Sequence, residues 1–181
     1  LEDKLSRILG SGFVLKLRSR EIIHTGGGAR VESLFTPGHE VDHVSYYLSR
    51  DRVMFTGDTV LGGSTSTVSN LVDYMKSLDL LASYRPLIVC PAHGPVVSNG
   101  TQRIQTYINH RKKREQQILA ALEKGLTDVA DIVNDIYPRS LKIGLRQAAA
   151  RNVKTHLAKL IAERKVIEDP ISYSLNSSST V

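Results

Sequence analysis

Short apolar runs alternate with turns rich in glycine and proline through the first hundred residues, and this pattern predicts strands. The predicted strands are residues 13–17, 21–24, 31–35, 44–48, 53–56 and 86–90. The glycines at 26–28 lack the Gly-x-x-x-x-Gly-Lys-Ser/Thr pattern of a phosphate-binding loop, so we interpret them as a hairpin turn. The N-terminal half is therefore predicted to be mainly a sheet with tight connections.

Helical spacing of apolar residues occurs at 1–9 and 71–84 and then dominates the chain after residue 100. Three further helices are predicted. The first spans 101–124, the second has Thr127 as its N-cap, carries apolar residues from Val129 to Ile136 and ends before Pro138, and the third spans 145–164. Val166 and Ile167 then begin a strand. Helices joined by a turn and followed by a strand resemble a winged-helix domain.

These patterns divide the chain into three parts. Residues 1–100 form the sheet-rich domain, residues 101–168 form the helical, winged-helix-like domain, and residues 169–181 form a serine-rich tail that we predict to be disordered.

The composition excludes several classes of protein. Of the 181 residues, 41% are hydrophobic and 23% are charged, which is ordinary for a globular chain and excludes disorder throughout. No apolar run approaches the ~18–20 residues of a membrane span, so no membrane partner is expected. Cys90 is the only cysteine, so there is no internal disulfide framework and a reducing compartment is favoured.

The net charge of +6 is concentrated near the C-terminus. Residues 101–168 hold 14 of the 24 Lys and Arg residues but only 7 of the 18 Asp and Glu residues. Such a surplus is expected of a domain that meets a polyanion. A solvated basic face without a partner is an equally weighted alternative.

Three turns that follow predicted strands each present one metal ligand. They are Thr36-Pro37-Gly38-His39, Thr56-Gly57-Asp58 and Pro91-Ala92-His93-Gly94. The ligands are separated by 19 and 35 residues. Imidazole suits zinc, copper and iron, and a carboxylate can bridge two cations. The order of these turns predicts a metal site at one edge of the sheet.

These turns resemble the second half of the metallo-β-lactamase superfamily. The resemblance implies an α/β fold, namely the C-terminal half of an αββα sandwich followed by the winged-helix-like domain. The segments 71–78 and 110–119 make the resemblance more specific, to the β-lactamase-like protein 2 group, whose members are metal-dependent endoribonucleases. The match covers roughly residues 10 to 168.

The resemblance also implies the roles of single residues. His39 would complete the histidine trio of a first metal, Asp58 would bridge both metals as the catalytic carboxylate, and His93 would serve the second. Asp42 and His43 would lie behind the ligands or beside the substrate. The intact site would hold two Zn²⁺ ions. The basic residues Arg111, Lys112 and Arg114 would lie near the cleft and bind RNA phosphates, with an exposed face lacking a partner as the alternative.

One expected motif is missing. The His-x-His-x-Asp-His string of the superfamily occurs nowhere in residues 1–181, and the chain begins with Leu1. We therefore expect a fragment without its N-terminal part, holding one zinc ion or none and inactive alone.

For the intact protein, the resemblance implies an endoribonuclease that cleaves single-stranded RNA by a metal-activated hydroxide. It also suggests the mitochondrial matrix, with the cytoplasm as the alternative, and a homodimer through the C-terminal domain is a further expectation. Two other functions are open. A thioester or lactam hydrolase of the glyoxalase II type would use the same metals, and a non-catalytic remnant would bind RNA or a partner protein without hydrolysis.

Overall fold

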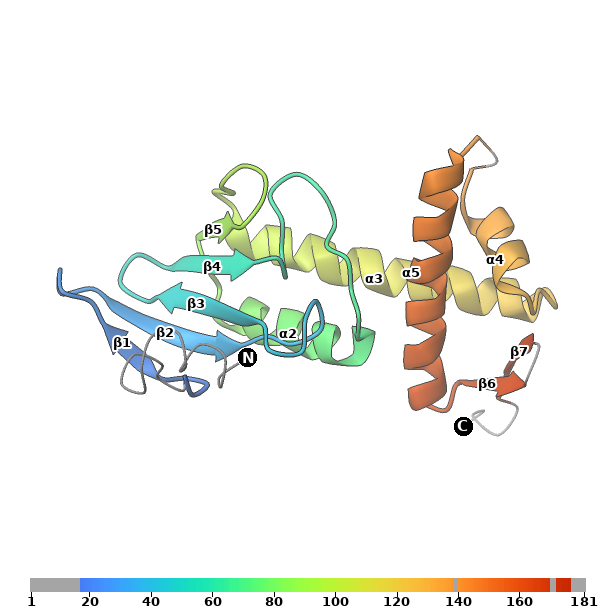
Figure 1. Cartoon of the computed structure of the whole chain (residues 1–181), viewed down its shortest axis with the longest axis horizontal. Helices are drawn as coiled ribbons and strands as arrows, with labels where there is room; N and C mark the ends of the chain where they lie inside the picture. Colours follow the sequence, from blue (N-terminus) through green and yellow to red (C-terminus); the bar gives the residue numbers. More distant parts are fainter. Residues whose placement is uncertain (1–16, 139, 170–171, 177–181) are drawn as a thin grey trace, which may run out of the picture.

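The computed structural model describes residues 17–138, 140–169 and 172–176 (Figure 1). Its N-terminal part is one five-stranded sheet in the order β1-β2-β3-β4-β5. The strands are β1 (Ile22–His24), β2 (Arg30–Phe35), β3 (Val44–Leu48), β4 (Val53–Gly57) and β5 (Ile88–Pro91). Neighbouring strands are antiparallel except β4 and β5, whose parallel pairing requires the crossover that α2 (Leu71–Ser83) provides. The glycines at 26–28 form the predicted turn between β1 and β2.

Two expectations lie outside the described residues. The helix predicted at 1–9 and all but the last residue of the strand predicted at 13–17 belong to the undescribed N-terminal segment.

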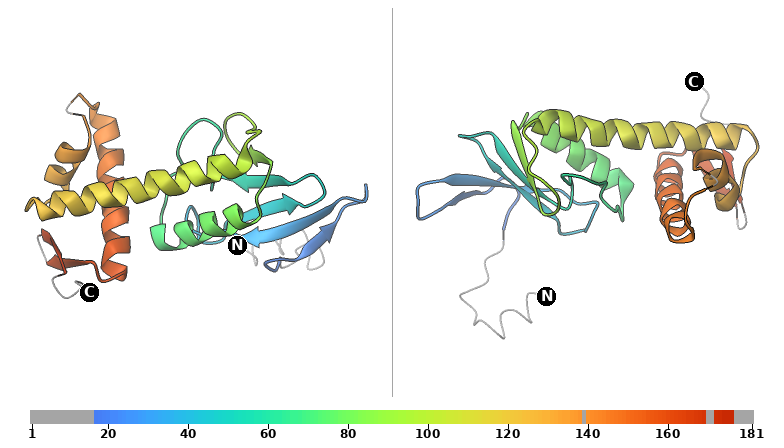
Figure 2. Two further views of the ribbon diagram at one scale, coloured as in Figure 1. Left: turned by 180° about the vertical axis from the view of Figure 1, so that it is seen from behind. Right: turned by 90° about the horizontal axis from the view of Figure 1, so that it is seen from above.

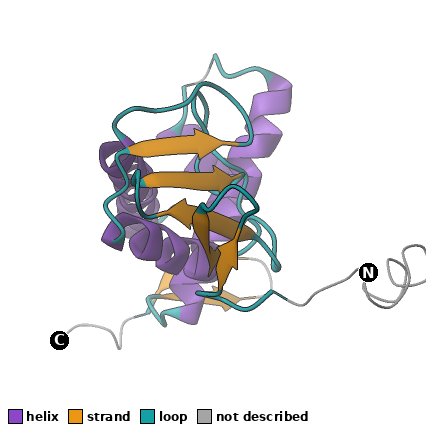
Figure 3. Cartoon of the chain, turned by 90° about the vertical axis from the view of Figure 1, so that its left-hand side faces the viewer, coloured by secondary structure: helices purple, strands orange, loops and turns teal. Residues whose placement is uncertain are grey.

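The two faces of the sheet have different surroundings. Tyr47, Met54 and Val89 stand side by side on β3, β4 and β5, and all three are buried against α2 and α3 (Gly100–Glu123). On the opposite face Tyr46 is in register with Phe55, which remains 43% exposed. Among the described residues no helix covers that second face (Figures 2 and 3). The observed part thus has the layout of a sheet covered by helices on one side.

Helix α3 joins the sheet to the C-terminal domain. Its first half contributes Ile104, Tyr107 and Ile108 to the core beneath the sheet, and its second half contributes Ile118 and Leu122 to a separate apolar core. The domain boundary predicted at residue 100 coincides with the start of α3, whereas the change from one core to the other falls inside the helix. One continuous helix therefore connects the two parts (Figure 2).

The C-terminal domain consists of the second half of α3, α4 (Val129–Ile136), α5 (Ile143–Ala162) and a two-stranded sheet of β6 (Val166–Asp169) and β7 (Ser172–Leu175). Helix α5 crosses α3 in the view of Figure 1. Helix, turn, helix and hairpin confirm the predicted winged-helix architecture.

Two details differ from the sequence predictions. The N-cap of α4 is Asp128, not Thr127, because the Asp128 carboxylate accepts a hydrogen bond from the Ala130 backbone N–H at 2.6 Å. Ser172–Leu175, assigned to a disordered tail, forms β7 and pairs with β6. Residues 170–171 and 177–181 of that tail lie outside the described part. Within the residues that the structure describes, no helix is both long and apolar enough to cross a membrane.

Candidate metal centre

The three turns identified in the sequence meet at one edge of the sheet. Asp58 lies between two histidines: its Oδ2 is 3.7 Å from Nε2 of His39, and its Oδ1 is 3.6 Å from Nε2 of His93. Each carboxylate oxygen therefore faces a different imidazole. This is the relationship expected of a carboxylate that bridges two metals with one histidine on each.

Backbone hydrogen bonds fix these turns to one another. The Gly38 carbonyl accepts from the N–H groups of Ser69 and Asn70, at 2.8 and 3.1 Å. The Gly57 carbonyl accepts from Ala92 N–H at 2.9 Å, and the His93 carbonyl accepts from Gly62 N–H at 3.0 Å. Because these bonds join segments that are far apart in sequence, the three ligand positions are set by the fold and not by the local turns alone.

Two glycines permit the close approaches at this edge. Gly38 has φ +128°, and a Cβ there would lie 2.4 Å from the Tyr74 backbone. Gly57 has φ +51°, and its Cβ would lie 2.6 Å from Nε2 of His43. Both combine a backbone conformation that favours glycine with space that only glycine leaves free.

The orientation of His39 is set by the loop at 61–70. Its Nδ1 is 2.8 Å from the Thr67 carbonyl oxygen, which can only accept, so Nδ1 carries the hydrogen. In the neutral ring Nε2 is then the nitrogen without a hydrogen, and it faces Asp58. Metal-binding histidines typically donate the N–H of their other ring nitrogen to such an acceptor, which fixes the tautomer and the ring orientation.

The donor set fits a metal of the zinc or iron type. Two ligands of one tetrahedral zinc lie about 3.3 Å apart when each bond is about 2.0 Å, close to the observed gaps. Among the described residues, however, three His, Cys, Asp or Glu side chains do not gather around one point. Further ligands are therefore needed to complete either metal.

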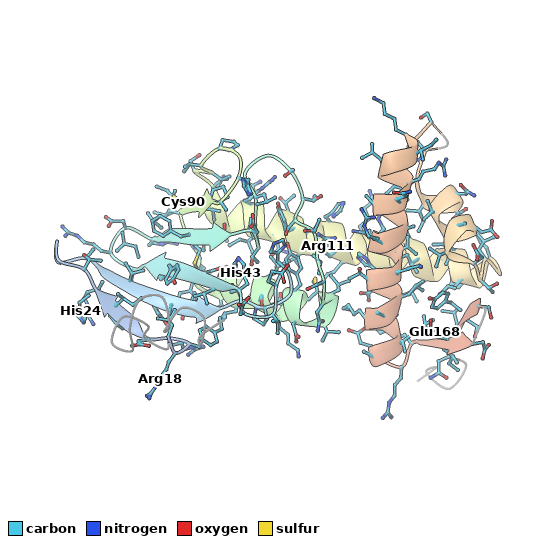
Figure 4. The ribbon with its side chains drawn as sticks, in the orientation of Figure 1. Arg18, His24, His43, Cys90, Arg111 and Glu168 are labelled. Carbon is cyan, nitrogen blue, oxygen red and sulfur yellow. The ribbon has the colours of Figure 1, made fainter. Side chains whose placement is uncertain are left out.

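His43 lies directly behind Asp58 and has no nitrogen available for a metal. Its Nε2 accepts from the Asp58 backbone N–H at 3.2 Å, and its Nδ1 lies 2.9 Å from Oγ1 of Thr36 and 3.1 Å from Oγ1 of Thr59. Burial lowers the pKa of His43, and the neighbouring His39 adds to that effect. The neutral ring of His43, which is labelled in Figure 4, thus positions the Asp58 turn through the hydrogen bond to its backbone. Asp42, the other residue assigned beside the ligands, is exposed.

The three predicted RNA-binding residues have different surroundings on α3. Lys112 is exposed. Arg114 is partly buried, with its guanidinium 4.1 Å from the ring centre of Tyr137, and burial lowers its pKa. Arg111 is only 3% exposed, and it donates to the Ser66 carbonyl oxygen at 2.6 Å. Only Lys112 is therefore presented fully to solvent.

Several contributors to the site have no signal in the sequence. Ser66 donates to the Asp58 carbonyl oxygen at 2.5 Å, and Tyr74 donates to the Thr59 carbonyl oxygen, also at 2.5 Å. Tyr74 is fully buried, and burial raises its pKa strongly. A loop of small polar residues is more often merely solvated, and only its placement against His39 and Asp58 shows that this one supports the site.

Comparison with known proteins now identifies the family. The model for the metallo-beta-lactamase superfamily matches residues 16–93, and the model for the beta-lactamase associated winged helix domain matches residues 129–172. A beta-lactamase-like protein 2 homolog of Caenorhabditis elegans is 37% identical over 145 residues, covering 79% of this chain and 48% of the relative. The chain carries a metallo-beta-lactamase superfamily domain followed by a beta-lactamase associated winged helix domain.

Two further matches agree with this assignment. An atrochrysone carboxyl ACP thioesterase of Aspergillus fumigatus is 44% identical over 96 residues, covering 53% of this chain and 30% of that protein. The crystal structure of a metallo-beta-lactamase family protein from Thermus thermophilus matches with a TM-score of 0.71 and 26% identity, covering 89% of this chain and 54% of that one. The chain spans about half the length of the curated relatives it matches. Members of the superfamily are generally hydrolases and generally bind metal ions.

Proposed function

We propose that the intact protein is a metal-dependent hydrolase that cleaves single-stranded RNA. The observation that carries the proposal is Asp58, whose two oxygens each face the Nε2 atom of a different histidine. His39 and Asp58 would hold one metal and Asp58 and His93 the other, each completed by further ligands. Zinc is the metal we propose, because two imidazoles and a carboxylate suit it. Metals so placed would supply an activated water at neutral pH and neutralise charge on the phosphate.

The residues of this chain would keep that site in place. The Thr67 carbonyl holds the Nδ1 hydrogen of His39, so Nε2 stays available as a ligand. His43 accepts from the backbone of Asp58 and restrains the turn from which the carboxylate projects. Because both hydrogen bonds are already formed, and the one to His43 is partly buried, little rearrangement is needed on metal binding.

RNA is proposed as the substrate on two grounds. The relative in C. elegans and its counterpart in Drosophila melanogaster carry the name beta-lactamase-like protein 2 homolog, the group that the sequence resembles. The basic surplus of residues 101–168 suits a polyanion held through its phosphates, and such binding weakens steeply with salt. The proposed location, the mitochondrial matrix, comes from the same resemblance.

The test is cleavage of a labelled single-stranded RNA by the intact protein and its Asp58→Asn variant. We expect the variant to lose at least 100-fold in rate while unfolding at an unchanged temperature, because amide and carboxylate have the same shape. Asp51→Asn is the matched control, since Asp51 is exposed in the turn between β3 and β4. RNA cleavage by the Asp58 variant at the wild-type rate would refute the bridging role.

Thioester hydrolysis is the second candidate, and the similarity to the A. fumigatus thioesterase favours it. The same protein would then release thiol from an acyl thioester and leave RNA intact. Measuring both reactions on one preparation separates the two functions. Loss of either activity in Asp58→Asn would assign it to the metal centre and not to a contaminant.

A further inference from the structure

A cavity of about 440 Å³ lies where the C-terminal domain meets the metal centre. One wall is the loop from Thr65 to Ser69 together with His39 and Glu40. The other wall comes from α3 and α5. It is formed by Arg111, Ala148, Arg151, Asn152 and Thr155. His39 thus belongs both to this cavity and to the proposed metal ligands.

Arg111 forms the buried side of the cavity, and none of the described residues gives it a charged partner. It is 97% buried, yet no carboxylate among the described residues forms an ion pair with it. One terminal nitrogen donates to the Ser66 carbonyl oxygen, and the guanidinium lies 5.4 Å from the ring centre of Tyr74. Its Nε is buried without a hydrogen-bond partner. A buried cation in this state is costly to the fold, and an anion entering the cavity would offset that cost.

Two residues of α5 complete the polar surface. Arg151 is exposed at the cavity and adds a second guanidinium. The side-chain oxygen of Asn152 is buried without a hydrogen-bond partner, like Nε of Arg111. Glu40 is the one acidic residue among those that line the cavity, and it is exposed. Two guanidinium groups and only one carboxylate, itself solvated, favour an anionic ligand. The unpartnered oxygen of Asn152 favours a hydroxyl or amine donor on that ligand.

The size of the cavity decides between kinds of nucleic acid. Its volume lies within the roughly 300–1,000 Å³ typical of small-molecule sites, which suits one nucleotide and not a duplex. In helix-turn-helix proteins the second helix enters the major groove of DNA. Here the corresponding helix, α5, contributes Arg151, Asn152 and Thr155 to a cavity that it shares with the metal-centre loop.

We propose that this cavity binds one nucleotide of the single-stranded RNA substrate. Arg111 and Arg151 hold its phosphate, and the Asn152 side-chain oxygen accepts a hydrogen bond from a ribose hydroxyl or a base amine. Because His39 lines the same cavity, a strand held there passes alongside the metal centre. The winged-helix domain would then act as a substrate clamp through α5. This proposal rests on RNA being the substrate.

The test measures binding alone, so that cleavage does not enter. A fluorescein-labelled 12-nucleotide single-stranded RNA is titrated with the chain in EDTA at several salt concentrations, and anisotropy is recorded. We expect Arg151→Ala to weaken binding by about 5- to 10-fold and to reduce the salt slope by about 0.7, as for one lost phosphate contact on a single strand. Asn152→Asp, which places a negative charge in the cavity, should weaken it by more than 10-fold.

Lys154→Ala is the matched control, because Lys154 is an exposed cation on the same helix that does not line the cavity. We expect it to change binding less than twofold. Equal losses for Arg151→Ala and Lys154→Ala would overturn the proposal in favour of a general basic face. Adenosine 5′-monophosphate that binds in an Arg151-dependent way, while RNA binding ignores Arg151, would also overturn it and assign the cavity to free nucleotides.

The outcome is separable from that of the proposed function. An intact protein that cuts RNA with an unchanged KM after Arg151→Ala and Asn152→Asp overturns the cavity assignment and leaves the nuclease function. RNA binding that depends on Arg151 and Asn152, without any cleavage by the intact protein, supports the cavity and overturns the nuclease function.

Discussion

The Asp58 backbone N–H donates a hydrogen bond to Nε2 of His43, with 3.2 Å between the two nitrogens. The carboxylate that we assign as the metal bridge is therefore attached to a backbone held by a neutral imidazole. That imidazole is held in turn by the hydroxyl groups of Thr36 and Thr59. The resemblance implied that His43 lies behind the ligands or beside the substrate, and these contacts make it a support for Asp58.

Gly57→Ala is expected to disrupt this support. The new Cβ would lie 2.6 Å from Nε2 of His43, and the backbone at φ +51° is strained for alanine. The conformational strain alone costs about 1–3 kcal/mol, and displacement of the ring adds to it. Urea unfolding of the chain should show a lower midpoint, and RNA cleavage by the intact protein should fall.

Gly27→Ala is the control for that substitution. Gly27 lies in the exposed turn between β1 and β2, and a Cβ there meets nothing within 4 Å. Its unfolding midpoint should stay within the error of the wild type. Equal stability of both variants would show that His43 does not need the space at residue 57.

The sequence predicts those parts of the molecule whose signals are local. Periodic apolar residues predict α2 and α5 to within about two residues, and strand-ending turns predict that His39, Asp58 and His93 belong together. A strand that ends in a Gly-containing turn projects its next polar side chain from the sheet edge, so each ligand is set by a few neighbouring residues.

Features that depend on distant contacts could not be predicted. The Thr67 carbonyl that orients His39 is 28 residues away, and a backbone carbonyl has no signature in a sequence. Arg111 belongs to a run of four basic residues, which favours solvent exposure, yet the crossing of α5 and the loop at Ser66 bury it. Thr127 and Asp128 are both good N-caps, and only the observed hydrogen bond to Ala130 selects the second.

Metal binding should depend on the part of the site that this chain supplies. Because the described residues do not bring three ligands around one point, we expect the purified chain to hold at most one zinc ion, and weakly. Metal analysis after gel filtration should give at most one zinc per chain, decreasing in His39→Ala and unchanged in His24→Ala, since His24 is exposed on β1. Two tightly held ions in the chain alone would contradict this picture of the site.

The stability of the C-terminal domain should fall as the pH falls from about 6.5 to about 4. His156 is 1% exposed, and burial lowers its pKa to about 4 from an ordinary 6.5. The unfolded chain therefore binds a proton at this residue before the folded chain does, so acid favours unfolding. Linkage allows a loss of up to about 3 kcal/mol once the pH is below both values.

Urea unfolding at pH 7.5 and pH 4.5 measures this loss. His156→Gln removes the titrating group and should flatten the difference between the two pH values, although it lowers stability at both. His24→Gln, at an exposed position, should leave the pH dependence as in the wild type. If the stability of His156→Gln depended on pH as steeply as that of the wild type, other titrating groups would be responsible for the pH dependence.

Lys159 should be more important for stability than an ordinary surface lysine. Its Nζ lies 2.6 Å from Glu115 on α3 and 2.7 Å from Glu163, and its side chain is only 11% exposed. Lys159→Met keeps the apolar stem but leaves Glu115, itself 17% exposed, beside one remaining and longer contact with Lys165 at 3.5 Å. Loss of a largely buried pair costs about 3–5 kcal/mol, and partial solvent access reduces our expectation to about 1–3 kcal/mol.

Lys124→Met is the control, because the Lys124–Asp135 pair is solvent-exposed and should contribute less than about 1 kcal/mol. Thermal and urea unfolding should therefore show a clearly larger loss of stability for Lys159→Met than for Lys124→Met. Lys159→Met should also weaken RNA binding, because the Lys159–Glu115 pair holds α5 against α3.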